Sequence, residues 1–334
     1  MNTAKIELHI HLDGSLNIRW AYERSLSQGV IPPGTSFQEY YDLLYGKNFA
    51  PRAVSIQKFQ LVCDILQTRE DLYDAAYELV KTLAGEGILY AEIRFASQQH
   101  TARGLTQYEA LKAVIDGAKQ AQNDNPPIRV GIINCLMHKG ESASCNHEQN
   151  LETVFVTKEL LGKGAVGLDL AGYENNCPLK DYAPYFEKAR ELGIPYTIHA
   201  GEMGIASHVK DAIDLGAQRI GHGINAVSDP AVLEELIAGK IPLEVCVTSN
   251  IKSTLNYASH PVRELIRRGV FVTLNTDNRI FAKTNLFNEH AQLRMIGVTE
   301  DELMRCTYNA VDAAFCDDET KKSLRAELRK DWNL

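Results

Sequence analysis

Two histidines stand two residues apart near the start of the chain, in the stretch ELHIHLDGS (7–15). The run KIELHI (5–10), which contains the first of them, has the apolar alternation of a β-strand. Side chains two residues apart on a strand point to the same face, so His9 and His11 should lie side by side. Imidazole nitrogens bind metals and transfer protons, and this pair therefore predicts one of those two kinds of chemistry.

Further polar residues of this kind follow other apolar runs. They are His199 at the end of PYTIHA and Glu202 just after it, His222 within RIGHG, and Asp277 and Asn278 after VFVTLNT. Taken singly, each has an ordinary structural interpretation as a core histidine, a surface glutamate or a turn residue. Together, three histidines and an aspartate provide the nitrogen and oxygen ligands that zinc prefers. Another carboxylate and histidine beside them would transfer protons, so the residues alone predict metal-assisted hydrolysis of a small polar substrate.

Eight apolar, β-branched runs are expected to be strands, and one amphipathic, helix-like segment follows most of them. The runs are 5–10, 88–95, 128–136, 166–171, 195–200, 219–223, 242–247 and 270–276. Eight strand–helix units predict a TIM (β/α)8 barrel, whose active sites lie at the C-terminal ends of the strands. A doubly wound open sheet is the alternative, because periodicity does not reveal whether a sheet closes.

Two regions exceed a minimal barrel. The first connection contains helix-like runs near 36–46, 53–67 and 70–86, which predict a helical insertion after strand 1 that would lie over the site. The tail after about 299 predicts extra C-terminal helices. Since no low-complexity segment or Pro/Gly/Ser-rich linker interrupts the chain, residues 1–334 are expected to form a single domain.

Composition excludes several functions. The chain has 334 residues and a net charge of −8, whereas binding of a nucleic-acid polymer requires a basic surface. No apolar run approaches the roughly 18 residues of a membrane span, and the N-terminus has no secretory-signal pattern. The seven cysteines form no CxxC pair, which favours free thiols in a reducing compartment and a cytoplasmic location. The oligomeric state stays open.

The chain resembles the adenosine deaminase family, which comprises metal-dependent aminohydrolases of the amidohydrolase superfamily. Five motifs in family order carry the resemblance: ELHIHLDGS (7–15), DLAGYE (169–174), HAGE (199–202), RIGHG (219–223) and LNTD (274–277). The resemblance implies one Zn²⁺ per chain, with the ligands His9, His11, His199 and Asp277. It also implies catalytic roles for three residues. Glu202 would move a proton at purine N1, His222 would orient the attacking hydroxide, and Asp277 would contact it.

The resemblance further implies a purine nucleoside as the small-molecule partner, bound by His11, Asp13, Gly172 and Asn278. Many members carry aspartate at the position of Asn278, and an asparagine NH₂ group donates to purine N7 without a change in protonation. Asp13 within HLDG favours adenosine and 2′-deoxyadenosine, because related adenine deaminases tend to read HLEG. The alternatives are a deaminase of another 6-aminopurine (adenine, aminodeoxyfutalosine or an N6-substituted adenosine), a two-metal hydrolase on the same barrel, and a non-catalytic nucleoside-binding protein.

Overall fold

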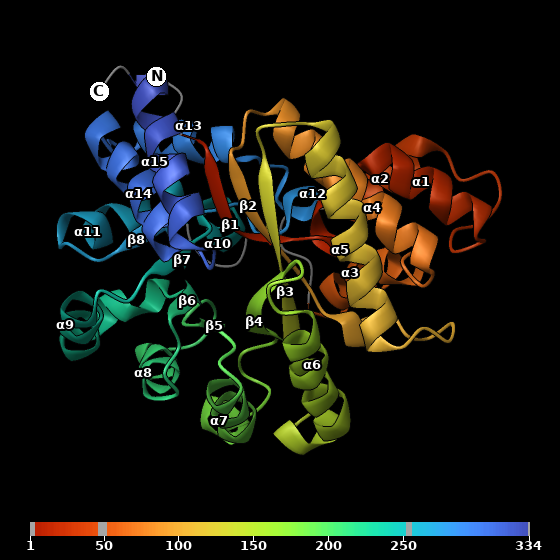
Figure 1. Ribbon diagram of the computed structural model, residues 1–334, viewed down its shortest axis with the longest axis horizontal. Helices are drawn as coiled ribbons and strands as arrows, with labels where there is room; N and C mark the ends of the chain where they lie inside the picture. The colour runs from red at the N-terminus through yellow and green to blue at the C-terminus, as the bar shows by residue number, and fades with distance from the viewer. Residues whose placement is uncertain (1–3, 46–51, 252–255, 333–334) are drawn as a thin grey trace.

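Eight parallel strands form the centre of the molecule (Figure 1). The computed structural model describes residues 4–45, 52–251 and 256–332. The strands are β1 (Ile6–His11), β2 (Tyr90–Phe95), β3 (Arg129–His138), β4 (Ala165–Gly172), β5 (Thr197–Ala200), β6 (Arg219–His222), β7 (Leu243–Val245) and β8 (Val272–Leu274). Each lies within or across one of the predicted runs, so the strand predictions are confirmed.

The strands close into a barrel at two seams. Regular pairing gives two sheets of four strands, in the orders β1-β2-β3-β4 and β5-β6-β7-β8. At the first seam the Leu168 N–H donates to the carbonyl of Pro195 at 2.9 Å. At the second, the Asp277 N–H donates to the His9 carbonyl at 2.8 Å, and the His11 N–H donates to the Asp277 carbonyl at 3.1 Å. The barrel prediction is therefore confirmed, and the second seam brings the first and last motifs of the chain together.

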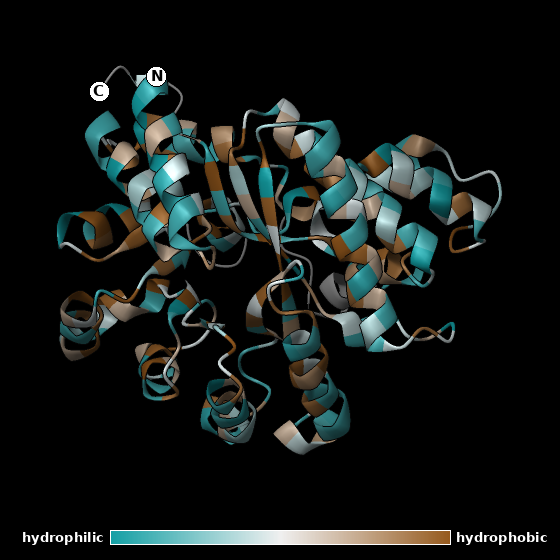
Figure 2. Ribbon diagram, viewed as in Figure 1, coloured by the Kyte–Doolittle hydropathy of each residue, from teal (hydrophilic) through white to brown (hydrophobic). Residues whose placement is uncertain are grey.

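Helices surround the barrel with their apolar faces inward, and teal polar residues colour much of their outer surface (Figure 2). They are α5 (Gln107–Asp124), α6 (His147–Leu160), α7 (Ala183–Glu191), α8 (Ala206–Asp214), α9 (Pro230–Gly239), α10 (Val247–Ile251), α11 (Val262–Arg267), α12 (Arg279–Ala282) and α13 (Leu286–Met295). The capping box of α5 shows how sequence fixes a helix start. The Thr106 side chain accepts from the Glu109 N–H, and the Glu109 carboxylate accepts in return from the Thr106 N–H.

In its described residues, the predicted insertion after β1 contains four helices, which lie together on one side of the barrel (Figure 1). They are α1 (Ile18–Ser27), α2 (Phe37–Tyr45), α3 (Arg52–Asp64) and α4 (Arg69–Gly85). The last three match the predicted runs, whereas α1 was not predicted. Its start is fixed by Asn17, whose side chain accepts from the N–H groups of Arg19 and Trp20. Helix α3 reaches the 3-10 turn Asp13–Ser15 at the end of β1.

Two C-terminal helices, α14 (Glu300–Ala313) and α15 (Asp318–Trp332), follow the barrel as predicted. Leu324, Leu328 and Trp332 of α15 are buried in one cluster with Ile6 of β1 and Tyr90 of β2. These helices therefore pack on the first strands of the barrel. Across the described ranges, no helix combines the length and apolar character that crossing a lipid bilayer requires.

Candidate metal and active site

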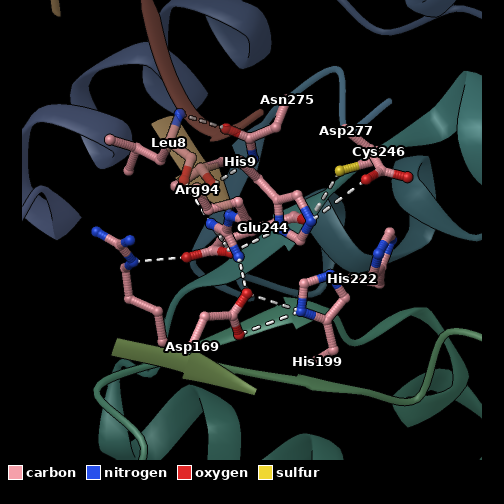
Figure 3. Close-up of polar contacts among 12 residues, drawn as sticks. Leu8, His9, Arg94, Asp169, His199, His222, Glu244, Cys246, Asn275 and Asp277 are labelled. Carbon is pink, nitrogen blue, oxygen red and sulfur yellow. Dashed lines mark hydrogen bonds and ion pairs between the residues drawn. The ribbon is translucent and has the colours of Figure 1, made fainter. Parts of the chain in front are cut away.

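Histidines from three strands converge on Asp277, which follows β8 (Figure 3). His9, His199, His222 and Asp277 each offer one ligand atom, and these four atoms lie within 4.8 Å of one another. His11 lies beside this group. Its Nε2 is 3.3 Å from Asp277 Oδ1, and its ring centroid is 5.4 Å from that of His9 and from that of His199. The strand ends thus bring all the predicted metal ligands to one place.

Two nitrogens in this group have unmet bonding capacity. His9 Nε2 and His11 Nε2 are buried, and neither has a hydrogen-bond partner within the described part of the chain. Leaving such atoms unpaired in a protein interior costs free energy, unless a ligand or ion pairs with them. Burial lowers the pKa of His9 well below its usual value and that of His11 to about 3. Both imidazoles are therefore neutral at pH 7, which is the form that binds a metal ion.

Two buried carboxylates orient the ligand imidazoles (Figure 3). Glu244 Oε2 lies 2.7 Å from His9 Nδ1, and Asp169 Oδ2 lies 2.9 Å from His199 Nδ1. Because a carboxylate accepts, the neutral form of each ring carries its proton on Nδ1 and keeps the Nε2 lone pair for the site. Arg94 joins the two carboxylates, at 2.7 Å from Asp169 and 2.9 Å from Glu244. The donor set and its supports fit a zinc site.

Sequence reasoning missed this supporting network. Arg219 Nε lies 2.6 Å from Glu244 Oε1 and completes it. Although burial raises the pKa of Asp169, His199 and Arg94 hold it well below its usual value. One signal in the sequence points to these residues. Arg94, Asp169, Arg219 and Glu244 are all charged, yet they lie within otherwise apolar strands, where a charge must have a partner.

His222 and Glu202, the predicted catalytic pair, lie beside the predicted metal ligands. His222 Nε2 is 3.7 Å from Glu202 Oε2. The Asn250 side-chain NH₂ donates to His222 Nδ1 at 3.1 Å, so in the neutral ring the proton sits on Nε2 and faces the site. Burial raises the pKa of the Glu202 carboxyl, and His222 partly offsets that rise. A carboxyl whose pKa is raised keeps its proton to higher pH than an ordinary glutamate, as a proton donor requires. Asn250 was another residue that sequence reasoning missed.

The Asp277 carboxylate is fixed from two sides. Ser249 Oγ donates to Oδ2 at 2.6 Å, and the Asn278 NH₂ group donates to Oδ1 at 2.6 Å. Asn278 in turn packs against Gly14 of the first motif. A Cβ atom on Gly14 would lie 1.8 Å from Asn278 Oδ1, so a glycine is required there. The Asn278 side chain thus occupies the space that a side chain at position 14 would need, and the first and last motifs pack closely.

The two remaining predicted site residues lie at strand ends on the same side of the barrel. Asp13 is buried, and its Oδ1 accepts from the Gly14 N–H at 3.0 Å. Its Oδ2 is 3.9 Å from the Cys63 thiol of α3, and burial raises its pKa to about 6. Gly172 is exposed at the end of β4 with φ +109°, and a Cβ there would approach the His138 carbonyl oxygen to 2.9 Å. Its place requires glycine.

Comparisons with known proteins agree with this geometry. The family model described as adenosine deaminase matches residues 4–331. An adenosine deaminase of Haemophilus ducreyi is 36% identical over 332 residues, which cover 97% of this chain and 95% of that protein. A solved adenine deaminase of Arthrobacter aurescens superposes with a TM-score of 0.87 at 25% identity and 99% coverage of both chains. An Arabidopsis N6-mAMP deaminase gives a TM-score of 0.84 at 25% identity, covering 98% of this chain and 97% of that one.

The match to the family model extends over nearly the whole chain. The motifs of the first and last strands meet at the C-terminal end of the barrel. The chain belongs to the adenosine deaminase family of the amidohydrolase superfamily.

Proposed function

We propose that this protein is a zinc-dependent deaminase that converts adenosine and 2′-deoxyadenosine to inosine and deoxyinosine, releasing ammonia. The observation that carries the proposal is the pair of buried, unpartnered nitrogens of His9 and His11 next to Asp277. We assign one Zn²⁺ per chain to the ligands His9, His11, His199 and Asp277. When bound, zinc lowers the pKa of water towards 7 and so supplies a nucleophile at neutral pH.

Side chains of the protein then donate the proton and orient the attacking oxygen. Glu202 donates a proton to purine N1, which draws electrons away from C6 and makes that carbon open to attack. The raised pKa of its carboxyl supports this role, because the group keeps its proton to higher pH than an ordinary glutamate. His222 directs its Nε2–H at the attacking oxygen and stabilises the negative charge that develops. Asp277, held by Ser249, orients the same oxygen. The oxygen of water bonds to C6, and the proton that water loses replaces the one that Glu202 gave to N1. The remaining hydroxyl proton moves to the 6-amino group, the C6–N bond breaks and ammonia leaves, so that the product is the 6-oxo purine with a proton on N1.

Four residues hold the substrate in this proposal. The Gly172 N–H donates to purine N3, where the absence of a side chain lets the ring approach closely. The Asn278 NH₂ group has two hydrogens, of which one serves Asp277, and the other donates to purine N7. Asp13 and His11 face the sugar. The Oδ2 atom of Asp13 has only the Cys63 thiol as a neighbouring donor among the described residues, which supports its accepting a sugar hydroxyl.

The specific alternative is a deaminase of another 6-aminopurine. It is favoured by the structural likeness to an adenine deaminase and to an N6-mAMP deaminase. Asp13 argues against free adenine as the substrate. Without a sugar hydroxyl to donate to it, the buried Oδ2 atom of Asp13 would lack a hydrogen bond from the substrate. The substrate is thus expected to carry a sugar.

The test compares adenosine and adenine by ultraviolet absorbance, using zinc-loaded protein and a chelator-treated control. Metal-dependent conversion of adenosine, with adenine unchanged, is the expected result. An Asp13→Ala variant should lose most activity on adenosine, because the sugar contact is gone. Turnover of adenine alone would overturn the assignment of Asp13, and turnover that survives complete metal removal would overturn the assignment of zinc.

The proposal also covers the partner, the domain organisation and the cellular location of the enzyme. Its partner is a small-molecule nucleoside, and residues 1–334 act as one catalytic domain. All seven cysteines are free thiols, which supports a reducing, cytoplasmic location.

A further inference from the structure

A carboxylate that the proposed mechanism does not use lies beneath the loop of Glu202. Glu174 follows β4 and is buried, with 6% of its surface exposed. It accepts four consecutive backbone N–H groups of the loop between β5 and α8: Gly201 at 2.5 Å, Glu202 at 3.1 Å, Met203 at 3.0 Å and Gly204 at 3.2 Å. His208 of α8 adds Nδ1 at 2.8 Å. Hydrogen bonds to an ionised acceptor are about twice as strong as neutral ones.

The loop is folded around this carboxylate. A Cβ atom on Gly204 would lie 2.8 Å from Glu174 Oε1 and 2.3 Å from His208 Nδ1, so the chain passes closer than any larger residue would allow. Gly201 has φ +68°, a left-handed conformation that glycine adopts without strain. Both glycines therefore serve to turn the backbone N–H groups towards one charged acceptor.

The same loop is held from the other side by its carbonyl groups. The Asn225 NH₂ group donates to the carbonyl of Gly201 at 2.9 Å and to that of Glu202 at 3.2 Å. The side chain of Glu202 itself is partly exposed. Its one ion-pair partner in the described ranges is His222, 3.7 Å away. The backbone hydrogen bonds therefore fix the position from which the Glu202 side chain extends towards His222.

We propose that Glu174 is a positioning residue that fixes the Glu202 carboxyl against purine N1. This inference rests on the proposed function, because it takes Glu202 as the proton donor. Glu174 lies two residues after Gly172, to which we assign the contact with purine N3. One short segment would then place both the base and the acid that protonates it, and a shift of Glu174 would spoil their alignment.

The test is the Glu174→Gln variant, assayed on the substrate that the wild-type enzyme deaminates. The amide keeps the shape but loses the charge, and it turns an NH₂ group towards N–H donors. We expect unchanged zinc content, a KM within about threefold, and a kcat lower by about 100-fold, since small misplacement of a catalytic group has effects of that size. The alkaline limb of the kcat–pH profile, along which a proton donor loses its proton, should shift as well. Glu174→Asp, which keeps the charge, should recover part of the kcat.

Asp71→Asn is the matched control, because Asp71 is a buried carboxylate of α4 that contacts Arg24 and Thr68 and none of the site residues. It should lower stability without changing kcat. A folded, zinc-loaded Glu174→Gln enzyme with kcat within threefold of wild type would overturn the inference. So would an equal kcat loss in both variants. Should Glu174→Gln not fold, Gly204→Ala displaces the same contact and should give the same kcat loss at unchanged KM.

Amide hydrogen exchange separates this inference from the proposed function. Residues 201–204 should exchange at least tenfold faster in Glu174→Gln than in wild type, whatever the substrate proves to be. Unchanged exchange would refute the clamp even in an active deaminase. Faster exchange in a protein that deaminates no 6-aminopurine would refute the proposed function instead, and with it the catalytic part of this inference.

Discussion

Replacing Glu244 by glutamine tests how the buried carboxylates support the metal ligands. The Glu244 carboxylate accepts hydrogen bonds from His9 Nδ1 at 2.7 Å, from Arg94 at 2.9 Å and from Arg219 at 2.6 Å. The neutral amide has a single acceptor oxygen and an NH₂ group that repels these donors. His9 would lose the partner that fixes its ring and its tautomer, and two arginines would lose a counter-charge in the protein interior.

Glu244→Gln is expected to lower both the zinc affinity and the stability of the protein, and the size of each effect can be given. Removing the partner of a ligating histidine lowers metal affinity by 10–100-fold, which corresponds to about 1.4–2.7 kcal/mol. Breaking a buried ion pair on one side costs about 3–5 kcal/mol of stability. The metal-free Glu244→Gln protein should therefore unfold at markedly lower urea concentration than metal-free wild type.

The assay is a chelator competition for zinc, combined with urea unfolding of the metal-free proteins. Glu92→Gln is the matched control. Glu92 is as deeply buried and lies 2.6 Å from Arg219, but it makes no contact with His9. It should lose stability with less than threefold change in zinc affinity. Zinc affinity of Glu244→Gln within threefold of wild type, or an equal affinity loss in both variants, would refute the reasoning.

Three further predictions address the substrate side and the pH response. Gly14→Ala should displace Asn278 and raise KM at least tenfold, because the new Cβ would lie 1.8 Å from Asn278 Oδ1. Gly85→Ala, whose new Cβ would meet open space, should leave the kinetics unchanged, and equal KM values for the two variants would contradict the contact. Asn278→Asp should retain activity but lose it more steeply at high pH, since only a protonated carboxyl donates to N7; a folded variant with no activity would count against that contact. Burial lowers the pKa of His290 to about 3, so between that value and 6.5 the unfolded chain binds more protons, and stability is lost as pH falls through this window. Urea unfolding of the metal-free proteins should show that His290→Gln reduces this loss by up to about 1.4 kcal/mol per pH unit between pH 5.5 and 4, and parallel profiles would show that His290 is not held neutral.

The barrel and the meeting of the motifs were predictable because they depend on local patterns. Each strand run is apolar and β-branched, and parallel strands end at the same side of a barrel. That His9 and His11 lie on one face follows from the alternation of side chains along one strand. That the distant Asp277 lies beside them follows only when the barrel closes, and backbone hydrogen bonds between Asp277 and β1 close it.

The supporting residues were not predictable in the same way. Arg94 and Glu244 are 150 residues apart, and periodicity carries no information on which buried charges will pair. Asn250 and Ser249 belong to a five-residue helix, α10, which is too short to show an amphipathic pattern. Helix α1 was missed although its sequence carries two helix signals. Asn17 is a cap residue, and Ile18, Ala21, Tyr22 and Leu26 recur at helical spacing and pack into the core.

Zinc titration tests the central claim most directly. Zinc is added stepwise to metal-free protein, and the conversion of adenosine to inosine is followed by absorbance at each step. The proposed site predicts that activity rises in proportion to added zinc and stops rising at one equivalent per chain. Full activity without zinc, a break at two equivalents, or zinc binding at one equivalent with no conversion of adenosine would each contradict the account.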